Sequence, residues 1–321
     1  MRTFAIVNQK GGCGKTTTSI NLAAMYARRG LRTLLIDMDP QAHCAAGLGV
    51  PEEQIEKHIG DAMIASHNEP IDKDIYLWEV TRNLHLAPST MMLTALEAPG
   101  GTLQSMPDRD RRLENVLKFW ENDFDRCVID CPPNIGLLTY NALRAATEAL
   151  IPVETGYFSL RGARRQRKTV DALIARIGKP LPCRIIPSIH RPSPLARTLL
   201  QRLQESFAPE VAPTVIRDHE TLREAASFGQ PVCDFAPGSE AEKDFEALVQ
   251  WLEEMYIPPP PIVEVATGSG GRAAELARRV GSFSVTSQAI PQSQSQPQQL
   301  DQQPPVIGRI QPEEQSNASE F

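Results

Sequence analysis

The sequence contains no apolar run that approaches the about 20 residues of a membrane span. It shows no signal-peptide hydrophobic region and no strong C-terminal amphipathic anchor, so we expect a cytoplasmic protein that lacks a stable membrane anchor. The formal net charge of −6 argues against a generally basic nucleic-acid binder and leaves only a local patch for such a contact. The six cysteines include no tetrahedral metal set, because nothing completes the pair Cys127 and Cys131. We therefore expect reduced core thiols.

Short apolar runs alternate with longer helical patterns through residue 257. Strands are predicted at residues 3–8, 32–37, 84–87, 126–130, 149–153, 183–188 and 212–216, and helices at residues 15–29, 137–146, 161–177, 195–207 and 239–256. This order predicts an α/β fold with a mostly parallel sheet, helices on both faces, and functional sites at the carboxyl ends of the strands. Residues 258–321 are rich in Pro, Gln and Ser and poor in large apolar side chains, so we predict a disordered tail.

A glycine-rich turn follows the first predicted strand. Backbone N–H groups in such a turn, with the positive end of a helix behind them, surround a phosphate group. The spacing is a variant of the P-loop: Lys15 and Thr16 stand where the phosphate-contacting lysine and the Mg²⁺-binding hydroxyl are expected, while Lys10 is an additional lysine. From local geometry, the Lys10 ammonium points either back over the loop or outward, toward a nucleotide held by another copy of the chain. The predicted nucleotide-binding residues are Lys10, Gly11, Gly12, Cys13, Gly14, Lys15, Thr16 and Thr17.

Acidic residues stand at the ends of two further predicted strands. Asp37 and Asp39 alternate along one strand and fall at its carboxyl end, next to the P-loop strand. Two such carboxylates can support the water shell of a magnesium ion and orient an attacking water; the alternative is a strand cap and a turn at Asp39. Asp130 ends an apolar run as a Walker B aspartate does. We expect Thr16, Asp37 and Asp130 to hold Mg²⁺.

These motifs, with the stretch from Leu222 to Val232, resemble the ParA branch of the ParA/MinD family, the deviant Walker A ATPases, over residues 1–257. The resemblance implies a P-loop NTPase domain at 1–257 that sandwiches ATP and Mg²⁺ in a homodimer. It implies that Lys10 contacts the phosphates held by the partner chain, and that Asp39 is the hydrolytic residue, so both are predicted to be catalytic. It further implies slow hydrolysis of ATP to ADP and phosphate, stimulated by a ParB-like protein, and partition or positioning of chromosomal or plasmid DNA or another cargo.

The chain departs from the family in its basic residues. Family members that bind the nucleoid commonly carry basic residues before the Leu222 motif, whereas residues 216–221 here include two acids, which puts DNA binding at that face in doubt. A different set of cations has the spacing of one helix face: Arg161, Arg164, Arg165 and Lys168. This set is either a solvated surface or a contact for DNA phosphates, an acidic partner or the second subunit. If this set binds DNA, we expect the cytoplasmic protein to associate with the nucleoid as well.

Two other classes of function share this fold. One is an ATP-driven switch at a membrane or on a non-DNA scaffold, similar to the cell-division branch of the family. The other is a metabolic P-loop enzyme, such as a dethiobiotin-synthetase-like ligase or a nitrogenase-reductase-like electron donor. The electron donor requires cysteines that bridge the dimer through an iron–sulfur cluster, and Cys131 does not stand in such a context.

Overall fold

The structure, a computed structural model, describes residues 1–66, 70–155 and 159–256. In this part of the chain a seven-stranded sheet forms the centre, with the strand order β3-β4-β2-β5-β1-β6-β7. The strands are β1 (Arg2–Ile6), β2 (Thr33–Asp37), β3 (Trp78–Thr81), β4 (Leu84–Ala87), β5 (Arg126–Asp130), β6 (Glu148–Glu154) and β7 (Cys183–Ser188). All neighbouring strands run parallel except β3 and β4. The predicted mostly parallel sheet is therefore confirmed.

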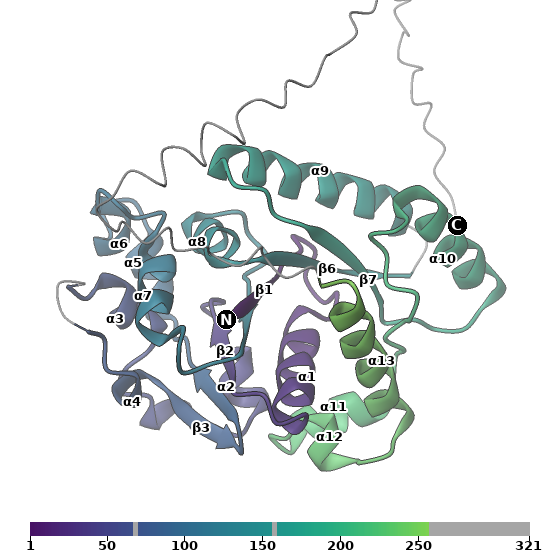
Figure 1. The fold of residues 1–321 in the computed structure, drawn as a ribbon, viewed down its shortest axis with the longest axis horizontal. Helices are drawn as coiled ribbons and strands as arrows, with labels where there is room; N and C mark the ends of the chain where they lie inside the picture. The colour runs from purple at the N-terminus through teal and green to yellow at the C-terminus, as the bar shows by residue number, and fades with distance from the viewer. Residues whose placement is uncertain (67–69, 156–158, 257–321) are drawn as a thin grey trace, which may run out of the picture. The chain divides into compact units, whose positions relative to one another are not determined.

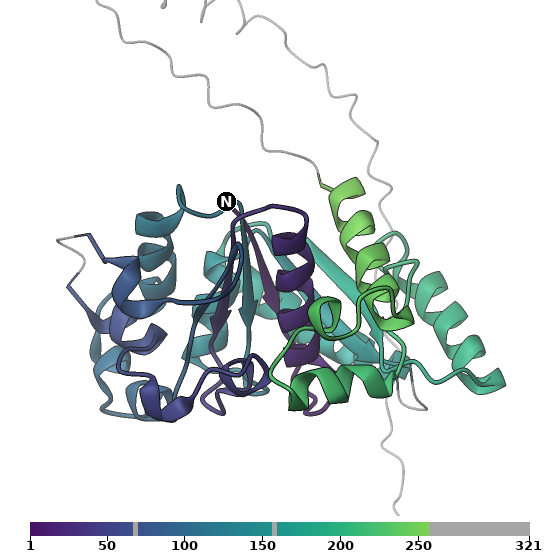
Figure 2. The ribbon, with the colours of Figure 1, turned by 90° about the horizontal axis from the view of Figure 1, so that it is seen from below.

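Helices cover both faces of the sheet (Figures 1 and 2). One face carries α3 (Ile59–Ile64), α5 (Met92–Glu97), α6 (Thr102–Ser105), α7 (Arg112–Trp120), α8 (Leu137–Ala145), α9 (Ser159–Ile177) and α10 (Pro194–Phe207). The other face carries α1 (Lys15–Arg28), α2 (His43–Gly47), α11 (Glu220–Ser227), α12 (Val232–Phe235) and α13 (Glu240–Glu254). The short helix α4 (Lys73–Tyr76) precedes β3, and a 3₁₀ turn spans Glu52–Gln54.

The apolar runs in the sequence become the two layers of the core. Every residue of β1, β2 and β4 to β7 except four is buried, because helices cover both sides of these strands. Side chains that alternate along one strand enter different layers: Ala5 packs beneath α7 and α8, whereas Phe4 and Ile6 pack beneath α1 and α13. All six cysteines are free and buried, as expected of core thiols, and Cys131 is fully enclosed.

Three strands bring their carboxyl ends together at the centre of the sheet. In β5, Asp130 is the register partner of both Ile6 at the end of β1 and Asp37 at the end of β2. The P-loop strand β1 therefore lies between β5 and β6, and β5 separates it from β2. The expectation that β2 adjoins the P-loop strand was thus wrong, since the later strand β5 is inserted between them.

The predicted strand at residues 212–216 is also wrong. This segment runs beside the edge strand β7, with isolated bridges from Val211 to Ile185 and from Arg217 to His190. Pro213 lies between the bridges and has no N–H to donate, which interrupts a ladder at this point.

The predicted tail at 258–321 lies outside the described residues, so the tail and the boundary at 257 stay predictions. None of the helices in the described ranges combines the length and apolar character that a membrane span requires.

Candidate functional site

The glycine-rich turn lies between β1 and α1 at the carboxyl edge of the sheet. Gly12 and Gly14 have φ values of +68° and +87°, a left-handed conformation that favours glycine. Gly14 is the N-cap of α1, so the unpaired N–H groups of the first helical turn face the loop. The Lys15 side chain is buried and its ammonium donates to the Lys10 carbonyl oxygen at 3.4 Å. The turn therefore forms an anion cradle closed by a lysine.

Two hydroxyl groups of α1 hold the carboxylate of Asp130. Thr16 Oγ1 donates to Asp130 Oδ2 at 2.6 Å, and Ser19 Oγ donates to Asp130 Oδ1 at 2.9 Å. Asp130 is buried, so both carboxylate oxygens obtain their donors from the first helical turn beyond the loop. Ser19 was not predicted from the sequence, although its i+3 spacing from Thr16 places both hydroxyls on one helix face.

Asp37 lies beside Asp130 and is fully buried. Its two oxygens accept the backbone N–H groups of Asp39 at 2.9 Å and Cys44 at 3.0 Å. Burial raises the pKa of Asp37, and the nearby charge of Asp130 raises it further. Burial also raises the pKa of Asp130, while the hydrogen bonds from Thr16 and Ser19 lower it. Two enclosed carboxylates held by neutral donors are suited to a small divalent cation that offsets their repulsion.

The donor set at this position fits a hard cation. Carboxylate and hydroxyl oxygens from Asp37, Asp130 and Thr16 are ligands that Mg²⁺ accepts directly or through water. Cys44 completes a buried cluster with the two aspartates, and the ligand atoms of these three residues lie within 4.8 Å of one another. Its thiol donates to Asp130 Oδ2 at 3.6 Å, and burial raises the thiol pKa well above its usual value. Cys44 is therefore a protonated support for the carboxylate, and no sequence signal distinguished it from the other core thiols.

Asp39 follows Asp37 and lies at the rim of the same cluster. Its side chain is 8% exposed, and its Oδ1 accepts the backbone N–H of Gln41 at 3.1 Å. Among the described residues no donor lies within hydrogen-bonding distance of its Oδ2. This carboxylate is consequently free to accept a hydrogen bond from a small molecule such as water.

The first half of the loop is attached to β6 and α9. Asn8 Nδ2 donates to the Pro152 carbonyl at 2.6 Å, and the Gln9 N–H donates to Gln166 Oε1 at 3.1 Å. The Lys10 ammonium forms an ion pair with the Glu154 carboxylate at the end of β6. Neither Glu154 nor Gln166 was predicted as a site residue. Glu154 shares with Asp37 and Asp130 the one available signal, an acid at the end of an apolar strand.

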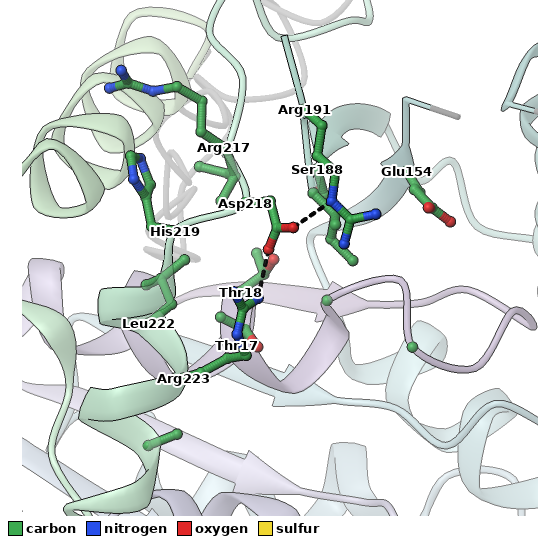
Figure 3. A pocket seen from close by; sticks show the side chains of 15 residues that line it. Thr17, Thr18, Glu154, Ser188, Arg191, Arg217, Asp218, His219, Leu222 and Arg223 are labelled. Carbon is green, nitrogen blue, oxygen red and sulfur yellow. Dashed lines mark hydrogen bonds and ion pairs between the residues drawn. The ribbon is translucent and has the colours of Figure 1, made fainter. Parts of the chain in front are cut away.

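A pocket of about 400 Å³ opens beside the loop (Figure 3). Its walls are Gly12, Gly14, Thr17 and Thr18 on one side, and the segments after β7 and before α11 on the other. Asp218 accepts hydrogen bonds from Arg191 at 2.5 Å and from Arg223 at 2.6 Å, which joins the two outer segments (Figure 3). The pocket continues the anion cradle into a space lined by both apolar and polar side chains.

Residues 216–221, which precede the Leu222 motif, form ion pairs within the chain. Arg217 pairs with Asp244 at 2.6 Å, and Glu220 pairs with Arg223. With Asp218 engaged as well, both acids of residues 216–221 have arginine partners within the chain.

The predicted basic set lies on one exposed face of α9. Arg161, Arg164, Arg165 and Lys168 are all exposed and line a shallow hollow with Thr169 and Ala172. Within the described part of the chain none of these four cations has an acidic partner, whereas their neighbour Arg167 pairs with Asp171 and Glu210. The opposite face of α9 is buried and includes Gln166. The structure thus brings the four residues together as one surface, on the face of α9 opposite Gln166, which bonds to the loop.

Comparisons with known proteins agree with this architecture. Residues 1–182 match the family model described as AAA domain. The chain is 33% identical to the chromosome partitioning protein ParA of Myxococcus xanthus over 267 residues, which cover 83% of this chain and 92% of that protein. It resembles the structure of a plasmid partition protein from Borrelia burgdorferi bound to AMPPNP, with a TM-score of 0.66 and 22% identity over 79% of this chain and 99% of that one. It also resembles cobyrinic acid a,c-diamide synthase from Mycobacterium smegmatis with an ATP analogue and magnesium, with a TM-score of 0.68 and 23% identity over 79% and 94%.

Proposed function

The chain belongs to the ParA branch of the ParA/MinD family of P-loop ATPases, and on that premise we propose that it is an ATP-dependent dimerising ATPase that partitions or positions DNA or another intracellular cargo. The observation that carries the proposal is the meeting of Thr16, Asp37 and Asp130 beside the glycine-rich turn. A chromosome-partitioning relative that matches over most of both chains supports this task over the membrane-switch and metabolic alternatives.

The proposed ligand is ATP with Mg²⁺. The triphosphate lies on the backbone N–H groups of residues 11–17, with Lys15 against the β- and γ-phosphates. The nucleoside occupies the adjoining pocket beside Thr17 and Thr18, because that pocket is continuous with the cradle. Thr16, Asp37 and Asp130 hold the Mg²⁺, which when bound neutralises charge on the phosphate oxygens. An ATP analogue and magnesium in a protein of the same fold support this choice.

Hydrolysis is assigned to a water oriented by Asp39. The free Oδ2 of Asp39 accepts a hydrogen bond from this water, whose oxygen attacks the γ-phosphorus as the bond to the β–γ bridging oxygen breaks. Lys15 stabilises the developing charge on the leaving phosphate oxygens. The products are ADP and phosphate. One carboxylate at the rim positions the water but supplies no full set of charges, so slow turnover is expected until a partner completes the site.

The proposed active form is a homodimer with two nucleotides at its interface. The Lys10 side chain is 61% exposed, and we assign it to the phosphates held by a second chain. A ParB-like protein stimulates hydrolysis and thereby dissociates the dimer. The proposal locates the protein in the cytoplasm and, in its ATP-bound dimeric state, on the nucleoid.

The surface proposed for DNA is the basic face of α9. Its four exposed cations lack acidic partners within the described residues, so phosphate contacts require no ion pair to be broken. The region of residues 216–221 is unsuitable, because Arg217 is already paired with two acids of α13 and both acids of the segment are paired with arginines of the same chain.

The test uses purified full-length chain with Mg²⁺ and either a non-hydrolysable ATP analogue or ADP. We expect a dimer by sedimentation and retention on non-specific DNA with the analogue, and neither with ADP. Lys15→Ala, which removes the lysine from the cradle, should bind no nucleotide and stay monomeric. A wild-type chain that stays monomeric with the analogue contradicts the proposal. A dimer that forms with the analogue but is not retained on DNA indicates a different cargo.

A further inference from the structure

The ammonium of Lys10 has a partner within its own chain. Lys10 Nζ forms an ion pair with Glu154 Oε2 at the end of β6, and both side chains are partly exposed, 61% and 30%. The backbone supports this arrangement: the Lys10 N–H donates to Asn8 Oδ1 at 2.9 Å, and the neighbouring Gln9 N–H is bonded to Gln166. The first half of the loop therefore directs Lys10 toward a carboxylate of the same chain.

Among the described residues, Lys10 is the polar partner of the Glu154 side chain. It lines the nucleotide pocket together with Gly12 and Gly14, where a carboxylate is unfavourable beside bound phosphates. Pairing with Lys10 offsets that charge while the chain is alone. The pair holds the ammonium on its own chain, so it competes with a contact between Lys10 and a triphosphate held by a second chain.

We infer that Glu154 is the intrachain counter-ion that retains Lys10 in the unpaired chain, and that ATP-dependent dimerisation breaks this ion pair. The inference rests on the proposed role of Lys10 in the dimer. Glu154 is a positioning residue, because it acts through Lys10. The triphosphate of the second chain carries more negative charge than one carboxylate and therefore displaces it, whereas a diphosphate offers a weaker competitor.

The size of the effect follows from the exposure of the pair. Exposed ion pairs of this kind shift an equilibrium by a factor of about 1.4 to 5. Two such pairs, one in each chain, break when the dimer forms. Removing the carboxylate should therefore lower the dissociation constant of the dimer by about 2- to 30-fold.

The experiment measures the monomer–dimer dissociation constant of full-length chain by sedimentation, with a non-hydrolysable ATP analogue and Mg²⁺, and with ADP. Glu154→Gln should give the tighter dimer, and Glu154→Asp, which retains the carboxylate, should restore wild-type behaviour. Asp123→Asn is the matched control, since it breaks a comparably exposed pair with Lys73 at the amino end of β5 and should change nothing. Glu154→Ser removes the same charge and replaces Glu154→Gln in this measurement if the Gln variant does not fold.

The outcomes separate this inference from the proposed function. A wild-type chain that does not dimerise with the analogue contradicts the proposed function whatever Glu154 does. A wild-type dimer with an unchanged or weaker Glu154→Gln dimer overturns the inference alone. The double variant Lys10→Ala with Glu154→Gln should stay monomeric, because the released lysine is missing; a stable dimer in that variant also overturns the inference.

Discussion

Asp37 and Asp130 are register partners at the ends of two neighbouring parallel strands, and both carboxylates are buried. Parallel register alone places them side by side, because the carboxyl ends of β2 and β5 coincide. Hydroxyl donors hold Asp130 and backbone N–H groups hold Asp37, but no cationic side chain is hydrogen-bonded to either of them in the described ranges. The pair is thus fixed in position before any ligand arrives.

Ser19→Ala should weaken Mg²⁺-dependent nucleotide binding about 10-fold, because outer-shell partners of this kind typically contribute a factor of 10 to 100. It should also lower the free energy of unfolding by about 1–3 kcal/mol, since Asp130 Oδ1 loses its donor in a buried site. Fluorescent-nucleotide titration with Mg²⁺ and with EDTA, and urea unfolding, measure the two effects. Ser19 Oγ is also within hydrogen-bonding distance of the Lys15 carbonyl oxygen at 3.0 Å, and Ser227→Ala, which removes the equivalent bond to the Arg223 carbonyl in exposed α11, is the control. Equal affinities in the two variants would count against the assigned role of Ser19.

Asp39→Ala should reduce phosphate release about 100-fold or more, in the range expected for loss of a group that orients or deprotonates a nucleophile. The nucleotide cradle is unchanged, so the ATP-bound dimer should persist longer than the wild-type dimer. Phosphate release and dimer lifetime are measured on the same sample. Asp74→Ala, which removes an exposed acid from α4, should behave as wild type. Wild-type phosphate release by Asp39→Ala would remove Asp39 from the mechanism.

Arg164→Gln with Arg165→Gln should weaken binding to non-specific DNA and reduce its salt dependence. Loss of two phosphate contacts lowers the slope of log K against log salt concentration by about 1.8. The control is Arg82→Gln with Lys118→Gln, which removes two exposed cations from the β3–β4 turn and α7 and changes the net charge equally. Filter binding at several salt concentrations measures both. Identical slopes for the two double variants would leave the basic face of α9 as solvated surface.

His190→Asn should reduce the loss of stability on acidification. Burial lowers the pKa of His190, and the charge of Arg217 lowers it further. The unfolded chain therefore binds a proton near pH 6.5 while the folded chain resists it, so stability is present above about pH 6.5 and is lost as the pH falls below that value. This one group contributes at most about 1.4 kcal/mol per pH unit.

Urea unfolding of His190→Asn at pH 7.5 and 5.5 measures this difference. Thr155→Val removes the 2.8 Å hydrogen bond to His190 without removing the titrating ring, so it should lower stability equally at both pH values. A pH dependence of His190→Asn equal to that of wild type would show that the ring is readily protonated in the folded chain.

Local sequence patterns predicted most of the architecture and the centre of the site. Apolar runs located β1, β2 and β4 to β7, and the longer periodic segments located α1, α8, α9, α10 and α13 within a few residues. The glycine-rich turn and the acids at strand ends could be recognised because each requires particular residue types at short spacing.

Contacts between distant segments could not be predicted from local sequence patterns. The Lys10–Glu154 pair, the Gln9–Gln166 bond and the Arg191–Asp218–Arg223 cluster join residues whose spacing carries no periodic signal. The insertion of β5 between β1 and β2 likewise depends on packing of whole elements. Residues 212–216 have the composition of a strand, yet Pro213 and the edge position leave only isolated bridges.

The bond between Gln9 and Gln166 gives α9 a mechanical connection to the nucleotide loop. Gln166 is buried on the inner face of this 19-residue helix, so the loop and α9 are joined directly by a hydrogen bond. The far side of the same helix presents the arginines to solvent. One helix therefore contacts the phosphate-binding loop through its buried face and carries Arg161, Arg164, Arg165 and Lys168 on its exposed face.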